Sequence, residues 1–386
     1  MNSIIATLIA KRSMSTRSSG PKSIRMDGQR ITMLMLLFVP LAYLGDHLEW
    51  NAILVFLFSG FAIIPLASII ASATESIADR VGFGLGGLLN ATFGNATEMI
   101  IAIVALSEGL VDLVKASIAG TLIANLLLAM GLAIFTGGIK YKEQTFNRSV
   151  ARINASSLNL ALTVMLAPAA IRATSQATPQ SLIDAFSLIA SILLLAYYGL
   201  TLVFSMRTHR GLYETGDLTK NGEHSRVVLD YSQSRLPFRP VVSLLVASIV
   251  LTLVSELLIR SLEHSIETLH LPPFFTGVIL IPLFGGAVEY LAAIRFARKN
   301  KIDLALAIAT GSSLQIAMFV APLLVIIGCF LEQPMNLDFH PFELLAIGVA
   351  VFITNSISND GRSHWLEGVL LLVAYLILAT AFFLHP

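Results

Sequence analysis

The chain has 386 residues, of which 55% are hydrophobic and 13% charged, and its mean hydropathy is +0.79. This composition is too apolar for a soluble protein of this length, and a net charge of +1 gives no basic surface for nucleic acid. The single cysteine, Cys329, excludes an internal disulfide and a site built from several thiolates. No HExxH motif and no nucleophile–base pair occur in the apolar segments, so we expect neither an enzyme nor a cofactor. The composition predicts an all-α polytopic protein in the lipid bilayer.

Residues 1–30 carry several Lys, Arg and Ser residues and no acid before Asp27. This pattern is typical of a cytoplasmic tail and also of an organelle transit peptide. We favour the tail. The sequence leaves open whether the host membrane is a bacterial-type plasma membrane or an organelle membrane.

Apolar segments suited to membrane-spanning helices follow one another along the chain. We predict eleven helices, the first of them short, over residues 31–45, 51–73, 86–107, 112–137, 151–171, 181–206, 241–261, 273–296, 302–329, 341–357 and 365–384. Lys and Arg gather in alternate connecting segments, whereas the other segments carry only Arg172 and Arg260. Because basic loops stay in the cytoplasm, this asymmetry predicts a cytoplasmic N-terminus.

The longest polar stretch, residues 207–239, mixes acids with bases and divides these helices into two sets. We predict an N-terminal cytoplasmic tail at 1–30, one helix plus a five-helix repeat at 31–206, a cytoplasmic connecting loop at 207–239 and a second five-helix repeat at 240–386. A solvated connector explains the loop, and a regulatory role is the alternative.

Glu98 is the acidic residue around which the sequence is organised. It lies in a long apolar run and follows Gly94, Asn95 and other small or polar residues. A carboxylate at mid-depth in a bilayer is costly and normally faces a polar cavity or a bound ion. Close helix packing explains the small residues but not the glutamate. The run therefore predicts a functional carboxylate beside irregular backbone.

The second half of the chain repeats this pattern around Glu289. When Glu289 is aligned with Glu98, Gly285 falls on Gly94 and Ser312 falls on Thr121, which lies 23 residues after the glutamate in each half. A five-helix unit repeated once places its copies in opposite orientations, because five is odd. Inverted repeats whose broken helices meet at the midplane are typical of secondary transporters.

Two glutamates that meet at the midplane repel each other unless a cation or protons lie between them. Hard divalent cations, calcium especially, prefer several oxygen ligands. We therefore predict an ion-binding site with Glu98 and Glu289 as metal ligands. Further ligands are expected from the side chains of Thr121, Asn125, Ser312 and Gln315 and from backbone carbonyls at Gly94 and Gly285.

The alternative for the hydroxyl groups is a hydrogen bond to their own helix. Secondary candidates for the site are Asn95, Ser313, Glu75 and Glu256. The last two lie near the ends of predicted helices, where an interfacial position is favoured over a role in a proton path.

Residues 85–98, with the sequence LGGLLNATFGNATE, resemble the first repeat motif of the cation/proton exchanger (CAX) family of the cation/calcium exchanger superfamily. Segments 64–67, 73–75 and 299–316 resemble other parts of that family, so the likeness covers most of the chain. The resemblance implies eleven helices, a hub of two inverted repeats and calcium export driven by proton influx. It also assigns the two motif acids to Glu98 and Glu289, the polar ligands to Thr121, Ser312 and Gln315, and the carbonyl ligands to Gly94 and Gly285.

The second motif departs from the family pattern. That pattern usually reads GNAAEH, whereas residues 285–290 here read GGAVEY. Gly286 and Tyr290 thus replace an amide and an imidazole, and a proton acceptor beside Glu289 is missing. Cation selectivity and the details of proton coupling therefore stay open.

We interpret the chain as a secondary active transporter that exchanges calcium for protons by alternating access. Calcium and protons are then its transported ions. The alternatives are an exchanger of the same superfamily that uses sodium or carries manganese or another cation, and a cation channel. Stoichiometry and assembly into a homo-oligomer stay open.

Overall fold

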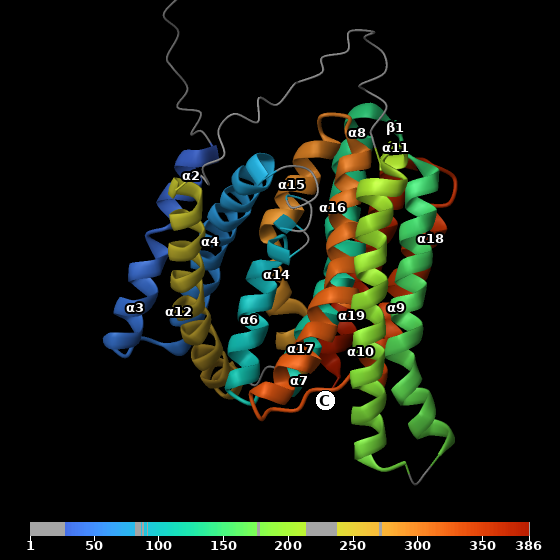
Figure 1. Cartoon of the computed structure of the whole chain (residues 1–386). Helices are drawn as coiled ribbons and strands as arrows, with labels where there is room; N and C mark the ends of the chain where they lie inside the picture. Colours follow the sequence, from blue (N-terminus) through green and yellow to red (C-terminus); the bar gives the residue numbers. More distant parts are fainter. Residues whose placement is uncertain are drawn as a thin grey trace, which may run out of the picture.

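The computed structural model describes residues 28–81, 86, 89–90, 92–175, 178–213, 238–269 and 272–385. Nearly all of the predicted N-terminal tail, most of the predicted connecting loop and part of the motif before Glu98 lie outside the described residues. The described chain is almost entirely helical (Figure 1).

The first half of the chain contains eight α-helices, two π-helical turns and one strand within the described residues. They are α2 (Gly28–Met35), α3 (Phe38–His47), α4 (Ala52–Val81), α6 (Ala96–Ser107), α7 (Val111–Ile123), η1 (Ala124–Ala129), α8 (Met130–Tyr141), β1 (Glu143–Thr145), α9 (Arg148–Thr174), α10 (Gln180–Val203) and η2 (Phe204–Thr208). The predicted helix 31–45 is divided, because the chain turns at Leu36 and Leu37 between α2 and α3.

The second half begins with the short α11 (Arg210–Tyr213). It continues with α12 (Phe238–Leu269), α13 (Pro273–Phe275), η4 (Thr276–Leu280), α14 (Ile281–Gly285), α15 (Ala287–Ala297), α16 (Ile302–Gln315), η5 (Ile316–Val320), α17 (Ala321–Phe330), α18 (Pro341–Ile357), β2 (Arg362–His364) and α19 (Trp365–Leu384). The helix α12 is longer at both ends than the predicted segment 241–261.

Seven helical runs in the described part of the chain are long and apolar enough to cross a membrane, or eight if the bent pair Pro273–Gly285 and Ala287–Ala297 is one span. Three shorter apolar helices, Thr32–His47, Ala96–Ser107 and Pro341–Ile357, fall in the remaining predicted segments. The chain is therefore a multi-pass membrane protein, and the count of eleven stays a prediction.

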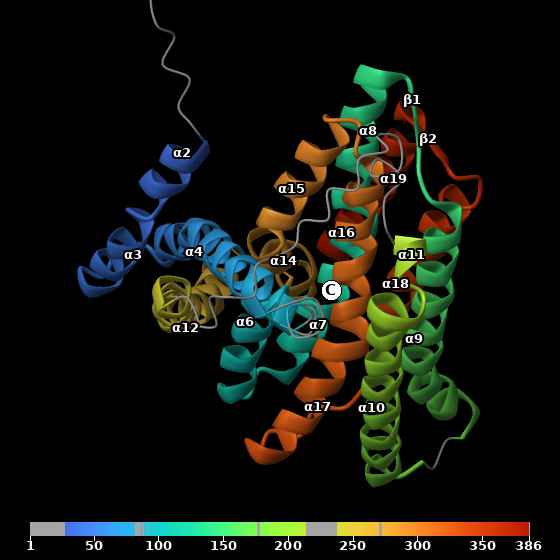
Figure 2. The same cartoon turned by 45° about the horizontal axis from the view of Figure 1, so that its top comes forward.

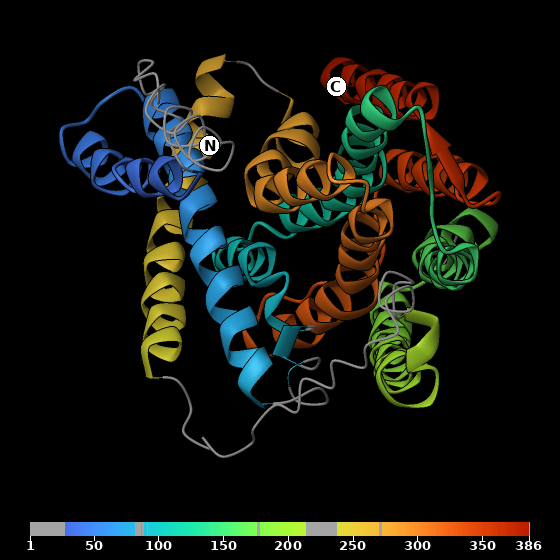
Figure 3. The same cartoon turned by 90° about the horizontal axis from the view of Figure 1, so that it is seen from above.

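The long helices α4 and α12 pack against each other and, with α3, form one edge of the molecule, while most of the other helices form a larger body (Figures 1 and 3). Between the two parts lies an apolar cluster that includes Ile63 of α4, Leu251 of α12 and Phe284 of α14. The ring of Phe284 meets the rings of Phe56 and Phe61 edge-on, at centroid distances of 5.8 and 5.7 Å. The break that follows α14 is thus held against the α4–α12 pair.

A small sheet closes one end of the molecule, which we call the sheet end. Strands β1 and β2 pair antiparallel, with Gln144 opposite Ser363 (Figure 2). The Gln144 amide donates to the Ala297 carbonyl at 3.0 Å and to Asn300 Oδ1 at 2.9 Å. The sheet end therefore joins three connecting segments whose positive charge predicts that they lie on the same side of the membrane.

Candidate ion-binding site

Both motif glutamates lie in the first turn of a helix that begins after a break in the chain. Helix α6 begins at Ala96, two residues before Glu98, and α15 begins at Ala287, two residues before Glu289. The second break bends the chain by 58° between α14 and α15. The free N–H groups of a helix N-terminus carry partial positive charge, which favours an anionic side chain there.

The two carboxylates lack the partners that buried charges normally have. Glu98 is 9% exposed, and neither of its oxygens has a hydrogen-bond partner within the described residues. In the half-buried Glu289 the same holds for Oε2. The two side chains are close enough to repel each other. Since an isolated buried charge costs far more than a paired one, this arrangement requires a bound cation or protons.

Glu98 also faces the break in the other half of the chain. A Cβ atom at Gly285 would lie 3.8 Å from Glu98 Cγ and 4.0 Å from its Oε1. The Glu98 side chain of the first half thus packs beside Gly285, whose carbonyl is a predicted ligand. Whether that carbonyl binds an ion stays a prediction.

Asn95 is the centre of a buried hydrogen-bond network that joins the two halves. Its Nδ2 donates to Gln315 Oε1, and its Oδ1 accepts the Ser312 hydroxyl at 2.6 Å. Asn125 Nδ2 in turn donates to Ser312 Oγ at 3.1 Å. Asn125 is 1% exposed, and its Oδ1 has no hydrogen-bond partner within the described residues. The network therefore offers a free oxygen of the kind that a hard cation binds.

Two of the predicted hydroxyl ligands bond their own helices. Thr121 donates to the Ser117 carbonyl and Ser313 to the Ala309 carbonyl, both at 2.8 Å. Each hydroxyl oxygen retains lone pairs, so neither residue is excluded as a ligand. Both side chains are buried near the network.

The structure does not bring the secondary acidic candidates to this network. Glu75 is exposed on α4. Glu256 is half-buried on α12 and interacts electrostatically with Tyr43 of α3. Gly94, by contrast, lies beside the network, because a Cβ atom there would lie 2.4 Å from the Asn90 carbonyl and 3.3 Å from Gln315 Oε1. Its missing side chain allows the close backbone turn before α6.

The available ligand atoms are oxygens. Among the described residues no three His, Cys, Asp or Glu side chains gather into one metal site. In the described residues the neighbouring network adds amide and hydroxyl oxygens to the two carboxylates. Such a ligand set suits hard cations, and it suits protons on the carboxylates themselves.

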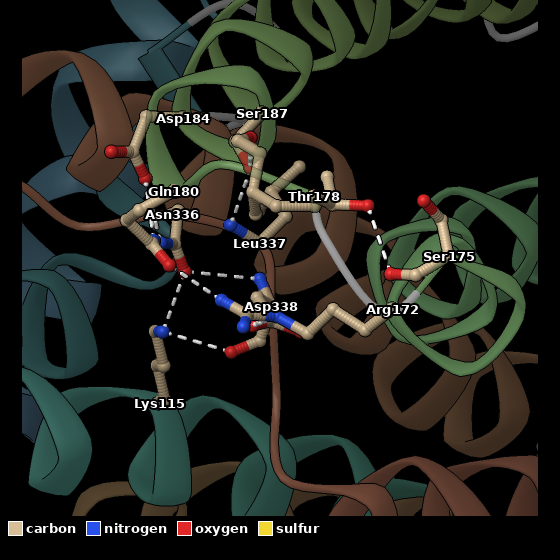
Figure 4. Close-up of polar contacts among 11 residues, drawn as sticks. Lys115, Arg172, Ser175, Thr178, Gln180, Asp184, Ser187, Asn336, Leu337 and Asp338 are labelled. Atoms are coloured by element: carbon tan, nitrogen blue, oxygen red, sulfur yellow. Dashed lines mark hydrogen bonds and ion pairs between the residues drawn. The ribbon is translucent and has the colours of Figure 1, made fainter.

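A second polar region lies at the end of the molecule opposite the sheet end, and the sequence analysis did not identify it. Figure 4 shows Lys115 of α7, whose Nζ donates to Asn336 Oδ1 at 2.7 Å and to the Asp338 carbonyl at 2.8 Å. Arg172 Nε pairs with Asp338 Oδ2 at 2.6 Å. Asn336 Nδ2 donates to Asp184 Oδ1 at 2.8 Å. We call this group, with Gln180, the Lys115 cluster.

The Lys115 cluster borders a cavity of about 720 Å³ that is also lined by Asp112, His340 and Glu343. Glu343 is 1% exposed, and its Oε2 accepts the His340 backbone N–H at 3.0 Å. The sequence offered one signal for this region, a lone lysine within a predicted membrane helix. Its partners lie more than 220 residues away in the chain, and local pattern does not reveal them.

Residues 51–207 and 239–384 match the sequence model of the family described as sodium/calcium exchanger protein. The chain belongs to this family. A Ca(2+)/H(+) antiporter of Aphanothece halophytica is 50% identical to this family member over 357 residues, which cover 91% of the chain and 96% of that protein. The Ca(2+)/H(+) antiporter ChaA of Bacillus subtilis is 40% identical over 346 residues, which cover 90% of the chain and 96% of that protein.

A solved structure shares the fold of this exchanger family member. The structure of native YfkE superposes with a TM-score of 0.76 at 37% identity and covers 92% of this chain and all of that chain. The predicted resemblance to the cation/proton exchangers is confirmed, and the chain is a membrane transporter and not an enzyme.

Proposed function

We propose that this protein exchanges calcium for protons across a membrane, with Glu98 and Glu289 binding either the cation or the protons. The observation that carries the proposal is a pair of carboxylates close enough to repel each other. Both oxygens of Glu98 and Oε2 of Glu289 have no hydrogen-bond partner within the described residues. One calcium ion or two protons neutralise such a pair equally well. Binding of one therefore displaces the other, which is the minimum requirement for exchange.

The internal repeat supports a central site built equally from both halves. The starts of α6 and α15 lie 191 residues apart, as do Glu98 and Glu289. The π-helical turns η1 and η5 interrupt the helices that follow: η1 contains Asn125, and η5 begins directly after Gln315. Such turns occur often at functional sites. We infer two inverted five-helix repeats after one N-terminal helix, with both halves contributing ligands.

Alternating access then couples the two ions. On the proton-rich side, protonation of both glutamates removes their charge and releases calcium. On the cytoplasmic side, loss of the protons restores the charged pair and allows calcium to bind. The relatives named Ca(2+)/H(+) antiporters support this assignment of the ions.

The test is calcium uptake into proteoliposomes with and without an imposed pH gradient, for the wild type, Glu98→Gln and Glu289→Gln. We expect uptake that requires an acidic interior, stops with a protonophore and is absent in both variants. Glu75→Gln is the matched control, because this exposed glutamate of α4 should be dispensable.

Each alternative has its own outcome in this assay. Uptake that follows a sodium gradient instead of a pH gradient would point to sodium coupling. If manganese inhibited calcium uptake at concentrations below that of calcium, manganese would replace calcium as the proposed transported ion. Calcium flux that ignores both gradients would favour a channel. Transport by Glu289→Gln at the wild-type rate would contradict a site shared by both halves.

A further inference from the structure

The two broken helices differ at the residues that flank their glutamates. In the first half these residues are Asn95 and Met99, and the aligned residues in the second half are Gly286 and Tyr290. Asn95 extends across the site to Ser312 and Gln315. Gly286 has no side chain to do the same.

Tyr290 occupies the space that a side chain at position 286 would need. A Cβ atom on Gly286 would lie 2.5 Å from Tyr290 Oη and 2.6 Å from its Cζ. Contacts this short cannot be tolerated without a shift of the ring. Tyr290 is 5% exposed and packs in the main apolar core, so its ring has little room to move. Glycine at 286 and tyrosine at 290 therefore depend on each other.

The tyrosine hydroxyl also bridges the helix break. It donates to the Pro282 carbonyl of α14 at 2.8 Å, although Tyr290 belongs to α15. The same carbonyl accepts the Gly286 N–H at 2.9 Å, and the Tyr290 N–H donates to the Gly286 carbonyl at 3.0 Å. The hydroxyl bond thus bridges the two helix segments at the 58° bend, while the two backbone bonds join Gly286 to each segment. The bend lies three residues before Glu289.

Building on the proposed function, we propose that Gly286 and Tyr290 act as one unit that fixes the bend between α14 and α15 and thereby positions Glu289 for the cation. Tyr290 is a positioning residue. The two helix breaks are consequently asymmetric, because the first supplies the Asn95 amide near Glu98, whereas the second supplies no side chain at Gly286 and holds Glu289 by a rigid bend.

The test is a double-mutant cycle that introduces the first-half residues into the second half. The chains are the wild type, Gly286→Asn, Tyr290→Met and the double variant, with Tyr290→Phe as the variant that removes only the hydroxyl. Calcium uptake driven by a pH gradient gives KM and maximal rate for each chain. Thermal unfolding of the same purified chains without calcium gives a measure that does not depend on the cargo.

We expect Gly286→Asn to lower uptake about tenfold through the clash with the ring. The double variant should recover to the level of Tyr290→Met, because the shorter side chain frees the space. Tyr290→Phe should raise KM for calcium about fivefold with a maximal rate within about twofold of wild type, since a loss of one hydrogen bond shifts the glutamate without unfolding the helix. A purely structural role would lower the amount of folded protein and leave KM unchanged.

Full activity of Gly286→Asn, or a double variant no better than Gly286→Asn, would overturn the coupled unit. An unchanged KM in Tyr290→Phe would overturn its positioning role. If the wild type itself failed to exchange calcium for protons, the proposed function would fail instead. Thermal unfolding of the four chains would still test the coupling of Gly286 and Tyr290. If the stability losses of the two single variants simply added in the double variant, the coupling would be contradicted whatever ion is transported.

Discussion

The central site and the Lys115 cluster both place charged groups inside a membrane protein, but they treat those charges in opposite ways. In the Lys115 cluster, Lys115 has two hydrogen-bond acceptors and Arg172 is paired with Asp338. In the central site, Glu98 has no partner on either oxygen within the described residues. The charged groups of the first arrangement have protein partners, whereas the Glu98 carboxylate of the second has none within the described residues.

This difference separates a structural role from a transport role. A buried charge with full hydrogen bonding stabilises one conformation and ties together the elements that supply its partners. A buried charge without partners is costly until an ion arrives, so its stability depends on that ion. The central site is therefore the part of the molecule in which cation binding and folding stability should be linked.

The largest expected effect is on stabilisation by calcium. At calcium concentrations about 1,000 times Kd, the wild type should gain about 4.1 kcal/mol of unfolding free energy. Glu98→Gln should lose this gain and, without calcium, should be more stable than the wild type, because one of two repelling charges is removed. Thermal unfolding in detergent, with and without calcium, measures both the stabilisation by calcium and the stability in its absence. If Glu98→Gln were less stable than the wild type without calcium, the unpaired charge of Glu98 would not be destabilising, and the contrast with the Lys115 cluster would be contradicted.

The next effect concerns Lys115→Ala. Hydrogen bonds to a charged group contribute about 1.5–3 kcal/mol each, so the loss of both should lower unfolding free energy by about 3 kcal/mol. The KM for calcium should stay within about twofold of wild type. Arg172→Ala is the matched comparison, with a smaller loss because its side chain is 45% exposed. A large rise in KM for Lys115→Ala would show that the cluster takes part in transport.

Asn95→Ala should have an intermediate effect on affinity and a small one on folding. The loss of one or two neutral hydrogen bonds, at about 1 kcal/mol each, should raise KM for calcium about tenfold. Ser261→Ala is the control, because this buried hydroxyl of α12 bonds carbonyls of its own helix and its removal should leave KM unchanged. Equal effects of the two variants would mean that the Asn95 network does not shape the site.

The smallest effect is a pH dependence of stability at the rim of the large cavity. Burial, and secondly the neighbouring His385, lowers the pKa of His340 below its ordinary value of 6.5. The unfolded chain then binds this proton more readily, so the contribution of neutral His340 is present above pH 6.5 and is lost as pH falls below that value. His340 Nδ1 accepts the Phe342 N–H at 3.3 Å, and protonation removes this helix cap.

His340→Asn keeps a capping acceptor and removes the titration. Its thermal stability should therefore fall less between pH 7 and pH 5.5 than that of the wild type. Identical pH profiles would show that His340 does not contribute to acid sensitivity.

The local pattern of the sequence predicted apolar helices, and the helices of the described residues fall in those segments. The roles of Glu98 and Glu289 stay predictions. Long apolar runs indicate spans because hydrocarbon requires an apolar surface, and an acid within such a run stands out because burying it is costly. Thr121 and Ser312 each lie 23 residues after their glutamate, and this shared spacing indicated a repeated unit. The predicted boundaries failed mainly where a helix is broken or extended, as at α2–α3 and in α12.

Only the tertiary structure decided which polar groups meet. Asn95 reaches Ser312 and Gln315 across more than 200 residues, and Lys115 reaches the segment around Asn336 in the same way. The Tyr290 hydroxyl reaches the Pro282 carbonyl across the break at Gly286, which the sequence motif does not reveal. Residue type and spacing determine what each helix can bury, whereas hydrogen-bond partners depend on how the helices pack and where their backbones bend.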